Sequence, residues 1–332
     1  MRAMRLFQPG SAEDNRLKLI DLPVPEPGLH QLRLRVHACG VCHTDLHTVE
    51  GEIHPPALPI TPGHQVVGVI DALGAECSER FKIGDRAGVP WLYSACGSCE
   101  FCLRGEENLC PNAQFTGFHV DGGYAETMLA REEYALPLPA EISDVQAAPL
   151  LCAGIVGYRS LRLADLNPGE KLGLVGFGAS AHLSLQVARH WGCTIFVFTR
   201  SVEHRQHALD LGAAWAGGIE DAPPDLLDRA VIFAPAGWMV PLTLGKIRPG
   251  GTLAINAIHT TPIPEMPYQL IYGERTLRSV ANATYQDGVE FLHLAAEIPV
   301  RATVRTYPLT EANQALLDMK HSRINGEAVL MI

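Results

Sequence analysis

The sequence predicts a two-part α/β protein, with a β-rich domain first and a doubly wound parallel sheet after it. The chain has 332 residues, which is enough for two domains of ordinary size. Hydrophobic residues make up 47% and charged residues 19%, as in a packed globular protein. Near residue 150 the pattern changes from short alternating strands to strands that alternate with helices.

The first part reads as short strands broken by turns. Residues 32–36 alternate between apolar and polar side chains, which indicates a strand with one buried face, and residues 66–72 form a second strand. Four prolines between residues 55 and 62 mark irregular connections.

The second part alternates strands and helices. Residues 171–175 form an apolar strand that runs into a glycine loop, a helical pattern follows, and residues 194–198 form a β-branched and aromatic strand. We expect a second helix over 202–211 and further strands over 230–234 and 251–256.

Mixed character returns from about residue 287. We therefore expect a first domain over 1–152, a second domain over 153–286, and a return to the first domain over 287–332.

Charge and hydropathy exclude several function classes. The net charge is −10 and no basic run is present, which argues against nucleic acid as a partner. No uninterrupted apolar stretch of membrane-spanning length appears, and the first ten residues lack the apolar core of a signal peptide. These features favour a cytoplasmic protein with no membrane partner.

Four of the nine cysteines crowd into one short segment with the spacing Cys96-x2-Cys99-x2-Cys102-x7-Cys110. Four thiolates on one loop can close a tetrahedron around a structural zinc. An iron–sulfur cluster is the alternative, but its last gap is usually three residues and its pattern is usually doubled. The spacing favours zinc.

A second set of donors is spread along the chain. Cys42, His64 and Cys152 are each weak signals alone, because a lone buried cysteine is usually a small apolar residue. Together they supply two thiolates and an imidazole, which is the ligand set of a catalytic zinc with one open position.

These motifs together resemble the zinc-containing medium-chain alcohol dehydrogenases along the whole chain. The matching segments are residues 40–47, 63–64, 84–86, 96–110 and 151–154 and the glycine loop at 176. The resemblance implies that residues 1–152 and 287–332 form a GroES-like catalytic domain and that residues 153–286 form a Rossmann dinucleotide-binding domain. It also implies two zinc ions per chain. It assigns Cys42, His64 and Cys152 to the catalytic zinc and the four clustered cysteines to the structural one.

The resemblance also implies roles for residues around the catalytic zinc. Thr44 would contact the alcohol oxygen, His47 would end the proton relay, and Asp45 would orient His64. His43 would lie near the cofactor pyrophosphate. Trp91 would line the substrate pocket, although a plain core tryptophan is an equal alternative.

Two positions depart from the family pattern. Gln65 stands where the family usually has Glu directly after the zinc-binding histidine, a carboxylate viewed as a transient extra ligand. Glu327 stands where the family often keeps an arginine for the pyrophosphate. Arg323 is a candidate substitute for that arginine, or a solvated surface charge.

The glycine loop predicts a dinucleotide site, because it follows a predicted strand and opens a predicted helix. Its residues are Gly176, Phe177, Gly178, Ala179, Ser180 and Ala181. The glycines permit a tight turn and close approach to the phosphates, and the helix N-terminus attracts negative charge.

The end of the second strand of this unit bears on the choice of cofactor. NAD-specific domains carry an acid there, whereas this chain has Thr199, Arg200 and Ser201, with Arg205 one turn later. An arginine suits a 2′-phosphate. The sequence favours NADP, with use of both cofactors or of NAD as alternatives.

We therefore expect an alcohol dehydrogenase, or aldehyde or ketone reductase, that moves hydride between a small alcohol and NAD(P). The alternatives are a zinc-free quinone-reductase relative, which would lack the zinc cysteines, and a non-enzymatic or zinc-impaired NAD(P)-binding relative. The resemblance implies a homodimer or homotetramer.

Overall fold

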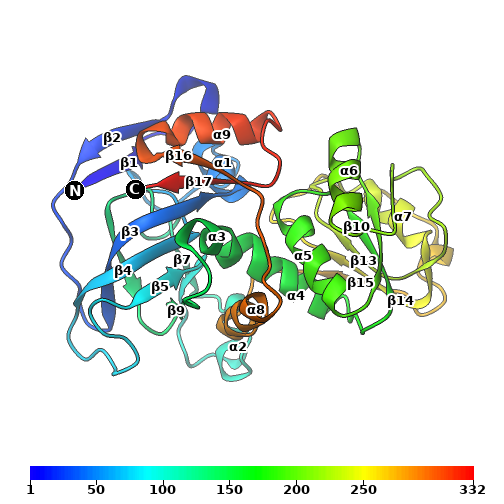
Figure 1. Ribbon diagram of the computed structural model, residues 1–332, viewed down its shortest axis with the longest axis horizontal. Helices are drawn as coiled ribbons and strands as arrows, with labels where there is room; N and C mark the ends of the chain where they lie inside the picture. The colour runs from blue at the N-terminus through cyan, green and yellow to red at the C-terminus, as the bar shows by residue number, and fades with distance from the viewer. The chain divides into compact units, whose positions relative to one another are not determined.

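The computed structural model describes all residues, Met1–Ile332. They form two compact units: Met1–Cys152, Thr284–Ala296 and Ala302–Ile332 in the first, and Ala153–Ala283 with Glu297–Arg301 in the second. The sequence placed the boundaries after residues 152 and 286, and the units have theirs after Cys152 and Ala283. Figure 1 shows the elements of both units.

The first unit is built on a seven-stranded sheet. Its order is β16 (Val304–Pro308), β17 (Glu327–Met331), β3 (Gln31–Val41), β4 (Val66–Leu73), β5 (Arg86–Val89) and β9 (Leu136–Pro137), and β8 (Thr127–Arg131) pairs with β3. Two small sheets pair β1 (Arg2–Leu6) with β2 (Leu17–Asp21) and β6 (Leu92–Ser94) with β7 (Gln114–Phe115). The helices are α1 (His43–Glu50), α2 (Glu100–Leu103), α3 (Asp144–Pro149), α8 (Tyr285–Glu297) and α9 (Ala312–Lys320).

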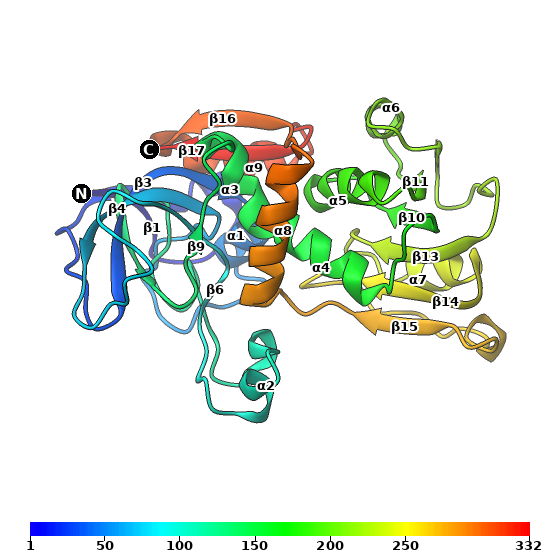
Figure 2. The same ribbon diagram turned by 60° about the horizontal axis from the view of Figure 1, so that its bottom comes forward.

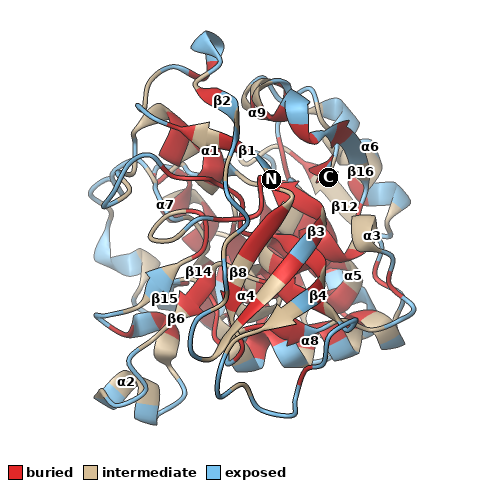
Figure 3. Ribbon diagram, turned by 90° about the vertical axis from the view of Figure 1, so that its left-hand side faces the viewer, coloured by how far each residue is buried: buried red, intermediate tan, exposed pale blue.

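Strand β3 organises this sheet. It pairs with β4 along one edge, while its other edge is shared between β8 at residues 31–35 and β17 at residues 38–41. The strand is longer than the expected segment 32–36, because its second half carries small and polar side chains that break the alternation. Figure 3 shows β3 and β4 coloured by burial. The end of β3 thus lies beside the last strand of the chain.

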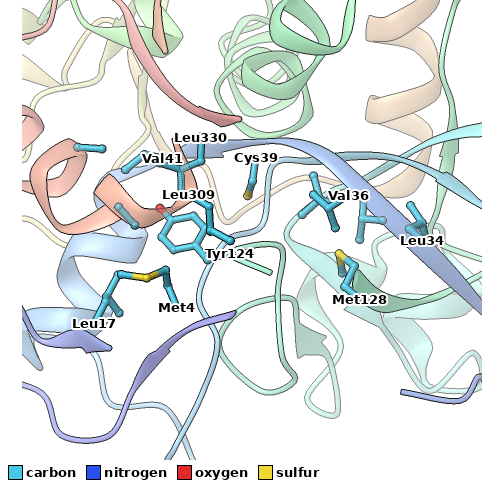
Figure 4. Close-up of a cluster of buried hydrophobic side chains, with 14 of the residues drawn as sticks. Met4, Leu17, Leu34, Val36, Cys39, Val41, Tyr124, Met128, Leu309 and Leu330 are labelled. Carbon is cyan, nitrogen blue, oxygen red and sulfur yellow. The ribbon is translucent and has the colours of Figure 1, made fainter. Parts of the chain in front are cut away.

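The core of the first unit packs against β3. Leu34, Val36 and Val41 of β3 belong to one buried cluster with Met128 of β8 and Tyr124. Figure 4 shows this cluster in close-up. Segments from both ends of the chain contribute to it, which binds residues 302–332 to the first unit.

The second unit contains a six-stranded parallel sheet. Its order is β12 (Trp215–Gly217), β11 (Thr194–Phe198), β10 (Lys171–Val175), β13 (Leu227–Ile232), β14 (Ile247–Ile255) and β15 (Thr276–Ser279). Its helices are α4 (Ile155–Leu163), α5 (Ala179–His190), α6 (Val202–Asp210) and α7 (Met239–Leu244). Counted within the unit, the strand order is 3-2-1-4-5-6, which is that of dinucleotide-binding sheets. The predicted fold class is confirmed.

Two strands of this sheet begin earlier than the sequence predicts. β13 starts at Leu227 instead of residue 230, and its second and third residues are the buried charged residues Asp228 and Arg229. Asp228 accepts the Lys171 N–H at 2.6 Å, and Arg229 donates to the Asp165 carbonyl at 2.8 Å. Such charges are typical of loops in sequence, and only tertiary partners make them tolerable inside a sheet. β14 likewise begins at Ile247, before a Pro-Gly-Gly segment.

None of the helices combines the length and the apolar character needed to cross a bilayer.

Replacing Leu34 by Ala should destabilise the first unit. The side chain is fully buried in the cluster around β3, so its loss removes apolar contacts and leaves a cavity. We expect a loss of about 2–5 kcal/mol in the free energy of unfolding, measured by chemical denaturation. Leu19→Ala on β2, where the side chain is 45% exposed, is the matched control and should change it by about 0.5 kcal/mol or less. Equal losses in both variants would show that β3 is not the centre of the core.

Candidate catalytic and metal centres

The three separated metal donors all belong to the first unit, and each stands at the end of an element. Cys42 follows β3 and precedes α1, and His64 comes two residues before β4. Cys152 lies in a π-helical turn, Leu150–Gly154, directly after α3. Single π turns are frequent at functional sites, because they redirect a side chain that a regular helix would aim elsewhere.

The structure brings these donors together. The Sγ atoms of Cys42 and Cys152 and a ring nitrogen of His64 all lie within 4.8 Å of one another. His64 is completely buried, and its Nε2 atom has no hydrogen-bond partner. An unpartnered buried nitrogen is costly unless a metal binds it. Two sulfurs and one such nitrogen match the donor set of a zinc site with one open position.

Asp45 connects the segments that carry these donors. It is buried on the first turn of α1, where its Oδ2 accepts the Cys42 N–H at 2.9 Å. Its Oδ1 accepts the Gly63 N–H at 3.0 Å and lies 3.2 Å from His64 Nδ1. This contact fixes the ring so that Nε2 is the free nitrogen, as expected of a carboxylate behind a metal-binding histidine.

Gly63 allows the chain to turn into this site. Its φ is +99°, and a Cβ there would meet the Tyr124 ring at 2.4 Å and Cys39 Sγ at 2.8 Å. Tyr124 was not expected at the site from sequence. Burial and the nearby Asp45 carboxylate raise its pKa well above the usual value.

The electrostatics of the cluster suit a cation. Burial lowers the pKa of His64, but the Asp45 carboxylate and the Cys42 thiol outweigh it and raise this pKa to about 10. A hydrogen bond from Cys152 is the main cause that lowers the pKa of Cys42, and the same contact raises the pKa of Cys152. Without metal, protons therefore supply the positive charge that this pocket stabilises.

Thr44 and His47 are three residues apart on α1 and so lie on the same side of the helix. The Thr44 hydroxyl lies 3.7 Å from Cys42 Sγ, next to the donor cluster. The His47 Nδ1 forms a hydrogen bond with the carboxylate of Glu52, a residue that sequence reasoning missed. Glu52 follows the glycine that ends α1, so its place five residues past His47 was the available signal. His43, the first residue of α1, is exposed.

Trp91 lies against His64 of the donor cluster. Its ring meets the His64 ring edge-on at a centroid distance of 4.7 Å and remains partly exposed. Phe115 stacks on it at 5.0 Å, and Phe118 lies 5.9 Å away. Sequence reasoning missed both phenylalanines, because the pairing of β6 with β7 brings Phe115 to Trp91 and Phe118 follows in the same segment.

The two departures from the family pattern meet at this site. Gln65 is completely buried, and both polar atoms of its amide lack partners. Glu327 is also buried, at the start of β17, where the charges of Cys42, His64 and Asp45 act on it. Arg323 is instead mostly exposed and lies 3.6 Å from Asp318.

The four clustered cysteines form a second centre in residues 95–113, which we call the cysteine lobe. Their Sγ atoms all lie within 4.8 Å of one another, with Cys99–Cys102 at 3.5 Å and Cys96–Cys102 at 3.9 Å. A tetrahedral zinc with Zn–S bonds of about 2.3 Å has edges of about 3.8 Å. One ion fits these spacings, whereas in a four-iron cluster each thiolate needs its own iron and the sulfurs stand farther apart.

The cysteine lobe has almost no apolar core. Only Asn108 and Cys110 are buried in it, and Leu103 and Leu109 are exposed. Figure 2 shows α2 lying apart from the strands of the first unit. Backbone N–H groups donate to these sulfurs; the Cys99 N–H, for example, donates to Cys96 Sγ at 3.3 Å. Such hydrogen bonds help lower the pKa of Cys96 to about 6. These contacts stabilise a thiolate at Cys96, which is the form that binds a metal, whereas burial and the neighbouring thiols raise the pKa of Cys102 to about 12.

The glycine loop lies in the second unit between β10 and α5. Gly176 has a φ of +85°, and a Cβ there would meet the Ala234 backbone nitrogen at 3.0 Å. Around Gly178 nothing lies within 4 Å of such a Cβ, which leaves room for a ligand to approach the backbone. Ala179 opens α5, Phe177 and Ala181 are buried, and Ser180 lies in the first turn.

The residues after β11 surround the end of that strand. Arg200 is exposed, and Arg205 Nε donates to the Thr199 carbonyl at 2.9 Å. Ser201 caps α6 by accepting the His204 N–H at 3.2 Å. Asp221, which sequence reasoning missed, accepts the Gly218 N–H at 2.7 Å after β12. An Arg205 nitrogen also faces Gly218.

Substitutions at the two centres should have separable effects. Cys42→Ala should remove one metal ion per chain and keep the thermal unfolding midpoint within a few degrees, because core packing supports that site. Cys102→Ser should remove the other ion and lower the midpoint more, because metal bonds replace a core in the cysteine lobe. Elemental analysis and calorimetry measure both. Equal loss of stability, or visible absorption from iron and sulfide, would contradict the two assignments.

Comparison with known proteins agrees with this geometry. Residues 28–140 match the family model described as the alcohol dehydrogenase GroES-like domain. The chain is 45% identical to the probable alcohol dehydrogenase AdhA of Mycobacterium tuberculosis (strain CDC 1551 / Oshkosh), covering 100% of this chain and 97% of that protein. Its fold matches a cinnamyl alcohol dehydrogenase from Sorghum bicolor with a TM-score of 0.91, at 27% identity over 99% of this chain and 97% of that one. A structure described as an NAD-dependent alcohol dehydrogenase matches with a TM-score of 0.90, at 25% identity over 100% of both chains. The chain therefore belongs to the alcohol dehydrogenases, and it is an oxidoreductase of that family.

Proposed function

We propose that the protein transfers hydride reversibly between a small alcohol and NAD(P), at a zinc ion held by Cys42, His64 and Cys152. The observation that carries this is the buried cluster of two sulfurs and one unpartnered imidazole nitrogen. Three protein donors leave a position for substrate, as in catalytic zinc sites. A second, structural zinc is proposed for Cys96, Cys99, Cys102 and Cys110, whose four donors leave no such position.

When bound, zinc supplies Lewis acidity that favours loss of the alcohol's proton. The chain's own groups then handle that proton. The Thr44 hydroxyl, 3.7 Å from Cys42 Sγ, accepts it from the alcohol and donates its own onward. His47 receives it at the other end of this turn of α1, and Glu52 holds the His47 ring in place. Trp91 and Phe115 exclude water beside His64 and favour an apolar substituent on the substrate.

A zinc-free quinone-reductase relative is less well supported. Such an enzyme has no need for thiolates at Cys42 and Cys152 or for the orienting contact from Asp45. A non-enzymatic relative is also less well supported, because Thr44 lies beside a complete donor set and His47 follows it on the same side of α1.

For the cofactor, we propose NADP in preference to NAD. The space around Gly178 accommodates a pyrophosphate at the N-terminus of α5. Arg200 is exposed at the end of β11, and Thr199, Ser201 and Arg205 surround the same point. Asp221 accepts a backbone N–H and, like Arg205, faces Gly218, so its charge is partly compensated.

The reaction is tested with the purified chain and a panel of short primary, secondary and aromatic alcohols. We expect oxidation with a nicotinamide cofactor, followed as reduced cofactor absorbance, and loss of turnover when a chelator removes the zinc held by Cys42, His64 and Cys152. Re-addition of Zn²⁺ should restore it, because the donor cluster persists without metal. Turnover that survives complete removal of both zincs would rule out the proposed chemistry.

The cofactor preference is tested by Arg200→Ala. We expect kcat/KM for NADP to fall about tenfold or more, because a charge-assisted contact with the 2′-phosphate is lost, while kcat/KM for NAD stays nearly constant. Arg189→Ala on the last turn of α5 is the matched control and should change neither value. A wild-type ratio in favour of NAD, or unchanged NADP use in Arg200→Ala, would disprove this assignment.

A further inference from the structure

Glu327 is a buried carboxylate that the mechanism above does not use. Its side chain belongs to the first residue of β17 and is only 4% exposed. Its Oε1 atom is fully buried and has no hydrogen-bond partner. An ionised carboxylate with a buried, unpartnered oxygen is unfavourable unless a nearby group compensates its charge.

The strand register places this carboxylate beside Cys42. β17 runs antiparallel to β3 with Ala328 opposite Val41, so the next pair along the two chains is Glu327 and Cys42. Side chains that lie opposite each other in antiparallel strands share a face and have Cβ atoms about 5 Å apart. The electrostatic influence of Cys42, His64 and Asp45 on Glu327, and of Glu327 on Cys152, agrees with this placement.

Gln65 occupies the same face of the sheet. A Cβ added to Gly40 would meet the Gln65 Oε1 at 2.6 Å, so the Gln65 amide lies over Gly40. Gly40 and Cys42 are two residues apart on extended backbone, so this face is also the one that Cys42 and Glu327 share. The position directly after His64 thus contributes an uncharged amide, and the neighbouring strand contributes the carboxylate.

Burial and the nearby Cys42 raise the pKa of Glu327 well above the usual value, and His64 opposes this shift. A divalent cation between the donors would favour the ionised carboxylate and so lower the pKa of Glu327. Carboxylate oxygens bind zinc at about 2.0–2.2 Å, and a site with three protein donors accepts a fourth or a fifth ligand.

We propose that Glu327 is an additional, exchangeable ligand of the catalytic zinc, a role that rests on the zinc site proposed above. Its Oε1 binds the metal when no substrate oxygen occupies the open position, and it withdraws when substrate arrives. Strand β17 therefore supplies the carboxylate that Gln65 cannot supply. In this proposal Glu327 acts on the metal, whereas the arginine that the family often keeps at this position acts on the cofactor pyrophosphate.

The test measures zinc affinity and not turnover. Full-length wild type and Glu327→Gln are titrated against a chromophoric chelator, and the two zincs are distinguished by their order of release. We expect Glu327→Gln to bind the catalytic zinc about 10–100-fold more weakly, with the zinc of the cysteine lobe unchanged. Glu311→Gln, which removes the same charge from an exposed position, is the matched control and should have no effect.

A double variant tests whether the carboxylate or the strand matters. Glu327→Gln combined with Gln65→Glu returns a carboxylate to the same face and should recover most of the lost affinity. The visible absorption of the Co²⁺-substituted protein should change in Glu327→Gln, because d–d bands report the ligand set and geometry. Thermal unfolding shows whether each variant is folded, and the double variant serves as the test if the single one is not.

Unchanged zinc affinity together with an unchanged Co²⁺ spectrum in Glu327→Gln would overturn this inference, as would an equal loss in Glu311→Gln. Failure of the proposed function has a different signature. In that case wild type itself would bind fewer than two zincs or oxidise no alcohol.

Discussion

The buried carboxylate of Asp45 is the contact on which the rest of the site depends. One oxygen holds the backbone of Cys42, and the other holds both the backbone of Gly63 and the ring of His64. Two segments separated by about twenty residues are thereby fixed to each other. A carboxylate buried to this extent is stabilised by the hydrogen bonds that it accepts. The carboxylate therefore sets which nitrogen of His64 is free and how far that nitrogen lies from the two sulfurs.

The sheet provides the second constraint. β3 ends at the site, β4 begins there, and β17 lies along the last residues of β3. Backbone pairing thus brings together side chains from positions near 42, 65 and 327. An arrangement made by sheet register is rigid, since a slip of one residue would turn every side chain to the opposite face. That rigidity suits a centre whose donors must hold fixed positions around an ion.

Much of this was predictable from sequence, for identifiable reasons. The cysteine lobe is a local motif, so its spacing alone indicates four donors around one ion. β10 and β11 coincide with the predicted strands because both are continuous apolar runs. The start of β13 was predicted three residues too late, because Asp228 and Arg229 find their partners only in the folded chain. The environment of Glu327 was not predictable, because it depends on the pairing of β17 with a strand nearly 290 residues earlier.

The near absence of buried apolar side chains in the cysteine lobe has a thermodynamic consequence. Burial of apolar surface gives folding its large heat-capacity change and hence the strong curvature of stability with temperature. A segment in which only Asn108 and Cys110 are buried contributes little to that term. If the lobe holds the proposed zinc, its local stability follows instead from mass action with free metal, and it grows with the logarithm of the zinc concentration. On that proposal, temperature acts mainly on the stability of the two sheets, and zinc concentration acts mainly on the stability of the lobe.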